Sequence, residues 1–65
     1  MTPATFRAIR KQLGLSQSGL AAMLGYSRAM RISEFERGAR EVPNLLALLM
    51  QAYADGYRPK GWPRA

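Results

Sequence analysis

The chain has 65 residues, with ten Lys or Arg, four Asp or Glu, a net charge of +6, and no His or Cys. A domain of this size removes only about 60% of its unfolded surface from water, and disulfides and the usual zinc ligands are excluded as stabilisers. No nucleophile stands beside a candidate base and no glycine-rich phosphate loop is present, so neither catalysis nor a cofactor is expected.

The basic balance predicts a polyanionic partner, because Lys and Arg neutralise phosphates and release counterions. A basic surface that only aids solubility is the alternative interpretation. No run of about 18 apolar residues and no signal-peptide pattern occurs, so we expect one cytoplasmic domain over residues 1–65 with no membrane segment. No metal and no small-molecule ligand are expected.

The first predicted helix begins at Thr2-Pro3, because Thr is a good N-cap and Pro suits the first helical position. Gly14 is a fitting end. Its apolar side chains share one face: Phe6, Ile9 and Leu13. Arg10 lies about 40° from Phe6 on the helical wheel. Because it borders the buried stripe, Arg10 needs a partner inside the protein.

The second predicted helix runs from Gln17 to Leu24, with Ser16 as its cap and Gly25 as its end. It buries Leu20, Ala21 and Leu24. The third predicted helix starts near Ser27 or Arg28 and stops at Gly38. Its inward stripe is Ala29, Ile32 and Phe35. Its outward side chains, which are mostly polar, are Met30, Arg31, Ser33, Glu34 and Arg37.

The fourth predicted helix runs from Pro43 to about Ala54 and is unusually apolar. Its apolar side chains cover roughly 200° of the circumference, whereas a surface helix needs somewhat over 100°. We therefore expect it to contact both the core and a second subunit, and deep burial in a monomer is the alternative. The tail over 56–65 is irregular because Pro recurs. The predicted dimer interface is Leu46, Met50, Tyr53, Tyr57 and Trp62.

Five short motifs occur in a characteristic order: Leu13-Gly14-Leu15-Ser16-Gln17, Leu20-Ala21, Leu24-Gly25, Ile32-Ser33 and Phe35-Glu36-Arg37-Gly38. Together they resemble the phage repressor and Cro family of helix-turn-helix regulators, also called the Xre family, over about residues 5–54. The resemblance implies an all-α, lambda-repressor-like domain of four helices, with the helix-turn-helix at about 16–38. In such domains the second helix crosses the DNA backbone and the third enters the major groove.

The resemblance also implies roles for particular residues. Gln17 corresponds to a phosphate-binding glutamine at the start of the second helix. Arg10 and Glu36 occupy the positions of a buried ion pair that links the first and third helices. The chain has one residue more than the usual pattern between Gly25 and Glu36. A helix that included Arg28 would turn this charge toward the core, so we place the extra residue in the turn, with Arg28 facing DNA.

Counting back from Glu36, the base-reading positions of the family correspond to Ala29, Met30 and Glu34. Arg28 or Arg31 is suited to a bidentate contact with guanine, Met30 or Ala29 to a thymine methyl, and Glu34 to cytosine N4. The alternatives are phosphate contacts for the two arginines and an ion pair with Arg31 or Arg37 for Glu34. The predicted DNA-binding set is Gln17, Ser27, Arg28, Ala29, Met30, Arg31, Ser33, Glu34, Arg37 and Arg40.

These expectations combine into a homodimeric transcription regulator that binds double-stranded DNA. We expect a repressor of its own promoter, with activation at other sites possible, from a phage or mobile element. Inverted half-sites one turn apart lie about 10–10.5 base pairs from centre to centre. The main alternative is a module of the same fold that binds a protein, as an antitoxin or antiactivator. An RNA-binding module is disfavoured because no exposed aromatic platform is expected.

Overall fold

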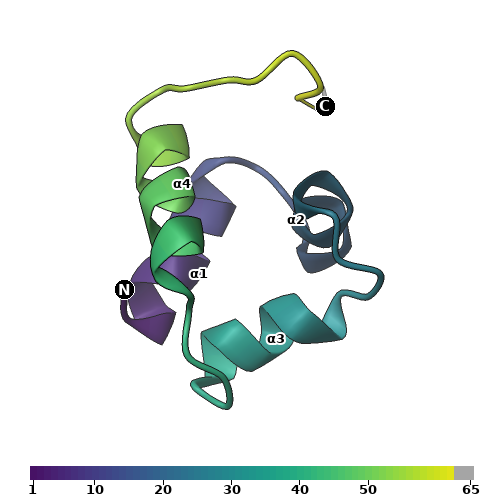
Figure 1. Ribbon diagram of the computed structural model, residues 1–65, viewed down its shortest axis with the longest axis vertical. Coiled ribbons are helices and arrows are strands. Elements are labelled where there is room, and N and C mark those ends of the chain that lie inside the picture. The colour runs from purple at the N-terminus through teal and green to yellow at the C-terminus, as the bar shows by residue number, and fades with distance from the viewer. Residues whose placement is uncertain (63–65) are drawn as a thin grey trace.

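A computed structural model describes residues 1–62 as four helices without strands (Figure 1). The helices are α1 (Pro3–Gln12), α2 (Gln17–Leu24), α3 (Met30–Arg37) and α4 (Asn44–Ala54). Residues 63–65 of the predicted tail lie outside the described residues. Each helix has only eight to eleven residues and would be marginal alone, so packing between helices stabilises the fold.

Local hydrogen bonds define the helix ends as predicted. The hydroxyl of Thr2 accepts the N–H of Thr5 at 3.1 Å, and that of Ser16 accepts the N–H of Gly19 at 2.9 Å. The second and third helices both end at a glycine with positive φ, 85° at Gly25 and 77° after α3. Glycine adopts this left-handed conformation without the steric cost of a Cβ atom, so the chain turns sharply at these points.

The third helix begins later than predicted, at Met30 rather than near Ser27 or Arg28. The preceding residues form an irregular turn, and Ala29 stands at the N-cap position without a side-chain hydrogen bond. Helical continuation through Arg28 would have turned a charge toward the core. The extra residue of this chain therefore lies in the turn, where Ser27 and Arg28 are exposed.

The hydrophobic core is formed by buried side chains from all four helices. Helix α3 packs against both α1 and α2, and α4 packs against α1 (Figure 1). Phe35 is fully buried, with its ring centroid 5.5 Å from that of Phe6 and 6.0 Å from that of Tyr26. The buried side chains are Phe6, Ile9, Leu20, Ala21, Ile32, Phe35, Val42, Leu46, Met50 and Tyr53. This packing holds α3 with one face inward and the other outward.

One face of α4 belongs to this core, which corrects part of the predicted dimer interface. Leu46, Met50 and Tyr53 are buried against the rest of the domain, so their side chains are not available to a second subunit. Their spacing of four and three residues forms the stripe that a helix turns toward its core. On the other side of α4, Leu45 and Leu48 are 82% and 69% exposed.

The tail folds back onto the end of α4. The guanidinium of Arg58 donates to the carbonyl oxygens of Tyr53 and Tyr57, both at 2.8 Å. It also lies 4.5 Å from the centroid of the Trp62 ring, whose edge approaches Tyr53 at a centroid distance of 5.0 Å. Trp62 is therefore held by its own domain, whereas Tyr57 is 53% exposed.

Candidate nucleic-acid interface

The turn before α3 and the first residues of α3 form an exposed surface. Met30 is 60% exposed, Ser27 and Arg28 are exposed, and Ala29 is half-buried. Because the opposite face of α3 carries the buried Ile32 and Phe35, this surface cannot rotate inward without exposing the core. Four of the predicted DNA-binding residues therefore lie together at the N-terminal end of α3.

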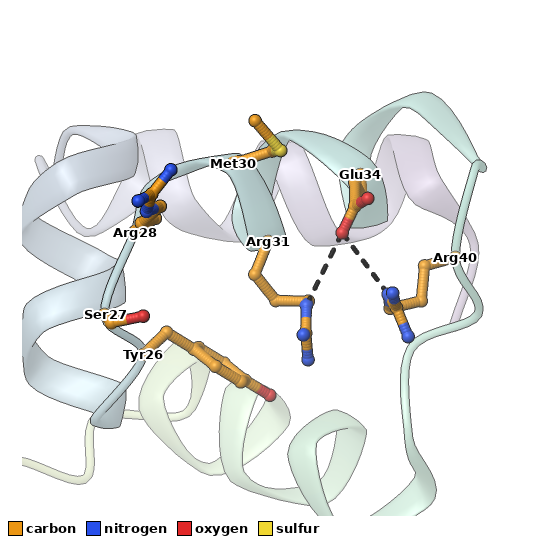
Figure 2. A pocket seen from close by; sticks show the side chains of 7 residues that line it. All are labelled: Tyr26, Ser27, Arg28, Met30, Arg31, Glu34 and Arg40. Carbon is orange, nitrogen blue, oxygen red and sulfur yellow. Dashed lines mark hydrogen bonds and ion pairs between the residues drawn. The ribbon is translucent and has the colours of Figure 1, made fainter.

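The carboxylate of Glu34 is the centre of a charged cluster on α3. Its Oε1 atom lies 3.4 Å from Nε of Arg31, one turn earlier, and 3.3 Å from Nε of Arg40, in the loop after the helix. Figure 2 shows both arginines converging on Glu34, whereas Arg28 and Met30 point away from the cluster. The alternative predicted for Glu34, an ion pair with Arg31, is present.

Arg37 points elsewhere, and its Nε donates to the hydroxyl of Ser33 at 3.2 Å. Arg40 reaches Glu34 because the chain reverses at Gly38. The backbone carbonyl of Glu34 accepts the N–H groups of Gly38, Ala39 and Arg40, the last two at 3.0 and 3.3 Å. The turn thus brings a residue that follows the helix back beside its middle.

Tyr26 is a member of this site that the sequence analysis did not identify. Its ring lies 5.4 Å from the guanidinium carbon of Arg31, a cation–π contact, and its other contact is with the buried Phe35. Arg31 is therefore held between an aromatic ring and a carboxylate. A hollow of about 230 Å³ is lined by Tyr26, Ser27, Arg28, Met30, Arg31, Glu34 and Arg40 (Figure 2).

Arg10 and Glu36 form the ion pair that the sequence analysis predicted between the first and third helices. Nε of Arg10 lies 2.6 Å from Oε2 of Glu36, and Nη2 lies 3.1 Å from Oε1. Nη1 of Arg10 donates to the carbonyl of Leu15 at 2.9 Å. The two side chains are only 11% and 5% exposed. The pair thus joins α1, the loop before α2, and α3.

Burial alone would raise the pKa of Glu36. The hydrogen bonds from Arg10 and Gln17 and the positive charges of Arg10 and Arg7 outweigh burial, so the pKa lies below its ordinary value of 4.5. Glu36 is consequently a carboxylate at neutral pH. Its part in the site is to hold its neighbours in place.

Gln17 lies at the start of α2, as predicted, and its Nε2 donates to Oε1 of Glu36 at 3.2 Å. An amide nitrogen carries two hydrogens, so one remains for a phosphate oxygen. Arg7 on α1 and Arg37 on α3 line the same small hollow of about 170 Å³ as Gln17. The sequence analysis did not select Arg7, although its place one turn before Arg10 was a usable signal.

Comparison with known families agrees with this geometry. A helix-turn-helix family model matches residues 6–52, which is most of the chain. The protein belongs to the helix-turn-helix family of the Xre/Cro/CI type, and its four helices have the lambda-repressor-like arrangement that the motifs predicted. Domains of this family indicate DNA as the partner and are typical of regulators without enzymatic activity. No curated protein and no solved structure matched the chain.

Within residues 1–62, no group of three or more His, Cys, Asp or Glu side chains is placed to hold a metal ion. No helix of the same residues has the length and apolar character needed to cross a bilayer.

Proposed function

We propose that this protein is a sequence-specific regulator of transcription, a repressor of its own gene that binds inverted DNA half-sites as a homodimer. The observation that carries the proposal is the exposed start of α3 in a helix-turn-helix domain, with Met30 60% exposed and Arg28 pointing away from Glu34 (Figure 2). The net charge of +6 adds a general attraction to the DNA backbone.

Base recognition is assigned to the N-terminal half of α3 and the turn before it. Arg28 is proposed to donate to O6 and N7 of guanine, because its guanidinium has no carboxylate partner among residues 1–62. Met30 is proposed to contact a thymine methyl. Half-buried Ala29 leaves room for a close approach of the helix to the base edges.

Backbone contacts are assigned to residues around this surface. Gln17 and Arg37 line one hollow beside α3, and Ser27 and Arg40 line the other. Contacts of this type fix the position of the helix on the duplex but carry no sequence information. Arg31 and Ser33 are proposed for either a base contact or a backbone contact. Arg31 lies against the ring of Tyr26, and Ser33 accepts a hydrogen bond from Arg37.

Dimerisation is assigned to the outward face of α4. Leu45 and Leu48 are exposed there, and Tyr57 follows the helix with half of its surface exposed. One domain of this size makes a small DNA interface and binds weakly. Two copies on half-sites about 10–10.5 base pairs apart would double the interface, which supports a dimer as the DNA-binding form.

The test is a binding titration against DNA from upstream of the protein's own gene and against random DNA, at several salt concentrations. The regulator is expected to prefer the upstream DNA by about 10³-fold or more, with affinity falling steeply as salt rises. Equal binding to both duplexes would refute sequence-specific regulation and favour a module of this fold that binds a protein.

Two variants separate the assigned roles. Arg28→Ala is expected to lose about 1–3 kcal/mol of preference for the upstream DNA with little change on random DNA. Arg37→Ala is expected to weaken both complexes equally. The slope of the logarithm of affinity against the logarithm of salt concentration is expected to become shallower by about 1. The opposite pattern, with Arg28→Ala weakening both duplexes equally, would reassign Arg28 to the backbone.

A further inference from the structure

The Glu34 carboxylate pairs with two arginines of the surface that the proposed function assigns to DNA. It is an anion between two guanidinium groups, at 3.4 Å from Arg31 and 3.3 Å from Arg40, on the helix that the proposed function places in the major groove. It is only 25% exposed, whereas the two arginines are 42% and 51% exposed. Both arginines of the cluster are thus already paired in the protein without DNA.

The surroundings keep this arrangement in place. Tyr26 lies against the far side of the Arg31 guanidinium, and the turn at Gly38 returns Arg40 to Glu34 through backbone hydrogen bonds to the Glu34 carbonyl. Side chains that are held in this way lose less entropy on pairing than free ones. Arg28 and Met30 line the same hollow, and their side chains point away from Glu34 (Figure 2).

The Nε atoms of Arg31 and Arg40 face Glu34, so a phosphate that approaches either guanidinium must compete with this carboxylate or bind beside its negative charge. Such a cost applies to every DNA sequence, because all sequences have the same phosphates. A base edge with an amino group offsets this cost, because the N4 amino group of cytosine can donate a hydrogen bond to the Glu34 carboxylate in place of the arginines. Repulsion between the Glu34 carboxylate and DNA phosphates therefore disfavours DNA that lacks a suitable base at this position.

We infer that Glu34 is a specificity-determining residue whose carboxylate holds Arg31 and Arg40 away from DNA phosphates and releases them where a base amino group takes their place. The inference rests on the DNA-binding function proposed above. According to this inference, Glu34 lowers the affinity of the protein for random DNA and also contacts one base at the specific site.

The test compares Glu34→Gln with Asp55→Asn. Both variants remove one negative charge, but Asp55 is the C-cap of α4, at the opposite end of that helix from the loop that follows α3. Among the side chains of residues 1–62, Asp55 bonds only to Gln51. Glutamine keeps the size and helix propensity of glutamate, so α3 is expected to stay intact, which circular dichroism checks. Affinity is measured for a random duplex of about 20 base pairs, two helical turns.

Glu34→Gln is expected to bind the random duplex about 2- to 30-fold more tightly than the wild type, the range that two exposed ion pairs represent. The slope of the logarithm of its affinity against the logarithm of salt concentration is expected to become steeper by about 1 to 2, because two further cations reach phosphates. Asp55→Asn is expected to change both quantities much less. An equal change in the two variants would overturn the inference, because net charge alone would then explain it.

A second variant tests whether the effect of Glu34 acts through the arginines, and a second DNA pool tests the proposed function separately. In an Arg31→Ala background, Glu34→Gln is expected to gain about half as much affinity for the random duplex, on a logarithmic scale, because only Arg40 remains to be released. An unchanged gain would overturn the inference. Sequences selected from a random pool by the wild type test the proposed function separately: the absence of any consensus refutes sequence-specific regulation, while the random duplex still decides the role of Glu34.

Discussion

Replacing Arg10 with Met should destabilise the protein more than any substitution on its surface. Arg10 donates twice to Glu36 and once to the carbonyl of Leu15, at distances of 2.6 to 3.1 Å. Methionine is similar in length, so it fills much of the space and isolates the loss of charge and hydrogen bonds. Glu36 is 5% exposed in the wild type, and in the variant it would keep Gln17 as its remaining side-chain donor.

The magnitude follows from these contacts. Breaking a buried ion pair by removing one partner costs about 3–5 kcal/mol, because the other charge stays buried and unpaired. Small domains have a total stability of roughly 0.05–0.15 kcal/mol per residue, which is about 3–10 kcal/mol for a chain of this length. The loss is thus a large fraction of the whole stability, and we expect Arg10→Met to unfold at a much lower urea concentration than the wild type.

Urea unfolding followed by circular dichroism measures this effect in a double-mutant cycle. The cycle uses Arg10→Met, Glu36→Met and the double variant, with Glu36→Gln as a milder change that stays measurable. The double variant is expected to recover much of the lost stability, because two apolar side chains replace the pair without a buried charge. A loss below about 1 kcal/mol in Arg10→Met would mean that the pair behaves like an exposed one, and the reasoning would be refuted.

Three further predictions concern pH, the tail and α4. Because the pKa of Glu36 is lowered in the folded state, its stabilising contribution is complete above pH 4.5 and is lost as pH falls through the folded-state pKa. The difference in unfolding free energy between wild type and Glu36→Gln should therefore shrink in acid, and a constant difference would contradict this. Trp62→Ala should cost about 1–2 kcal/mol through loss of its contact with Tyr53, and calorimetry should show a melting temperature lower by about 4–8 °C per kcal/mol; an unchanged value would place Trp62 outside the packed structure. Leu45→Ser combined with Leu48→Ser should dissociate the proposed dimer in sedimentation experiments while leaving the helix content seen by circular dichroism nearly unchanged, since both side chains are exposed. A variant that remains dimeric would remove α4 from the interface.

Local chemistry accounts for the features that could be predicted from the sequence. The caps at Thr2 and Ser16 and the end of α2 at Gly25 depend on hydrogen bonds and backbone angles within three or four residues. The partner of Arg10 followed from its position beside the buried stripe together with the family resemblance. The core face of α3 followed from the helical period at Ile32 and its neighbours.

Features that involve two distant segments were decided only by the tertiary structure. The sequence of α4 shows more apolar residues than one interface needs, but only its packing against α1 shows that Leu46 and Met50 are buried and that Leu48 is exposed. In the same way, the alternative predicted for Glu34 was an ion pair with Arg31 or Arg37. The structure has the pair with Arg31, and the turn after α3 adds a pair with Arg40.

The physical reason is the range of the forces involved. Helix propensity, capping and turn conformation act between close neighbours in the chain, so this sequence determined four helices, their approximate ends and an arginine-bearing surface at the start of α3. Ion pairs and apolar contacts depend on distance in space. The packing of α1 against α3 and the turn at Gly38 therefore decided which charges meet.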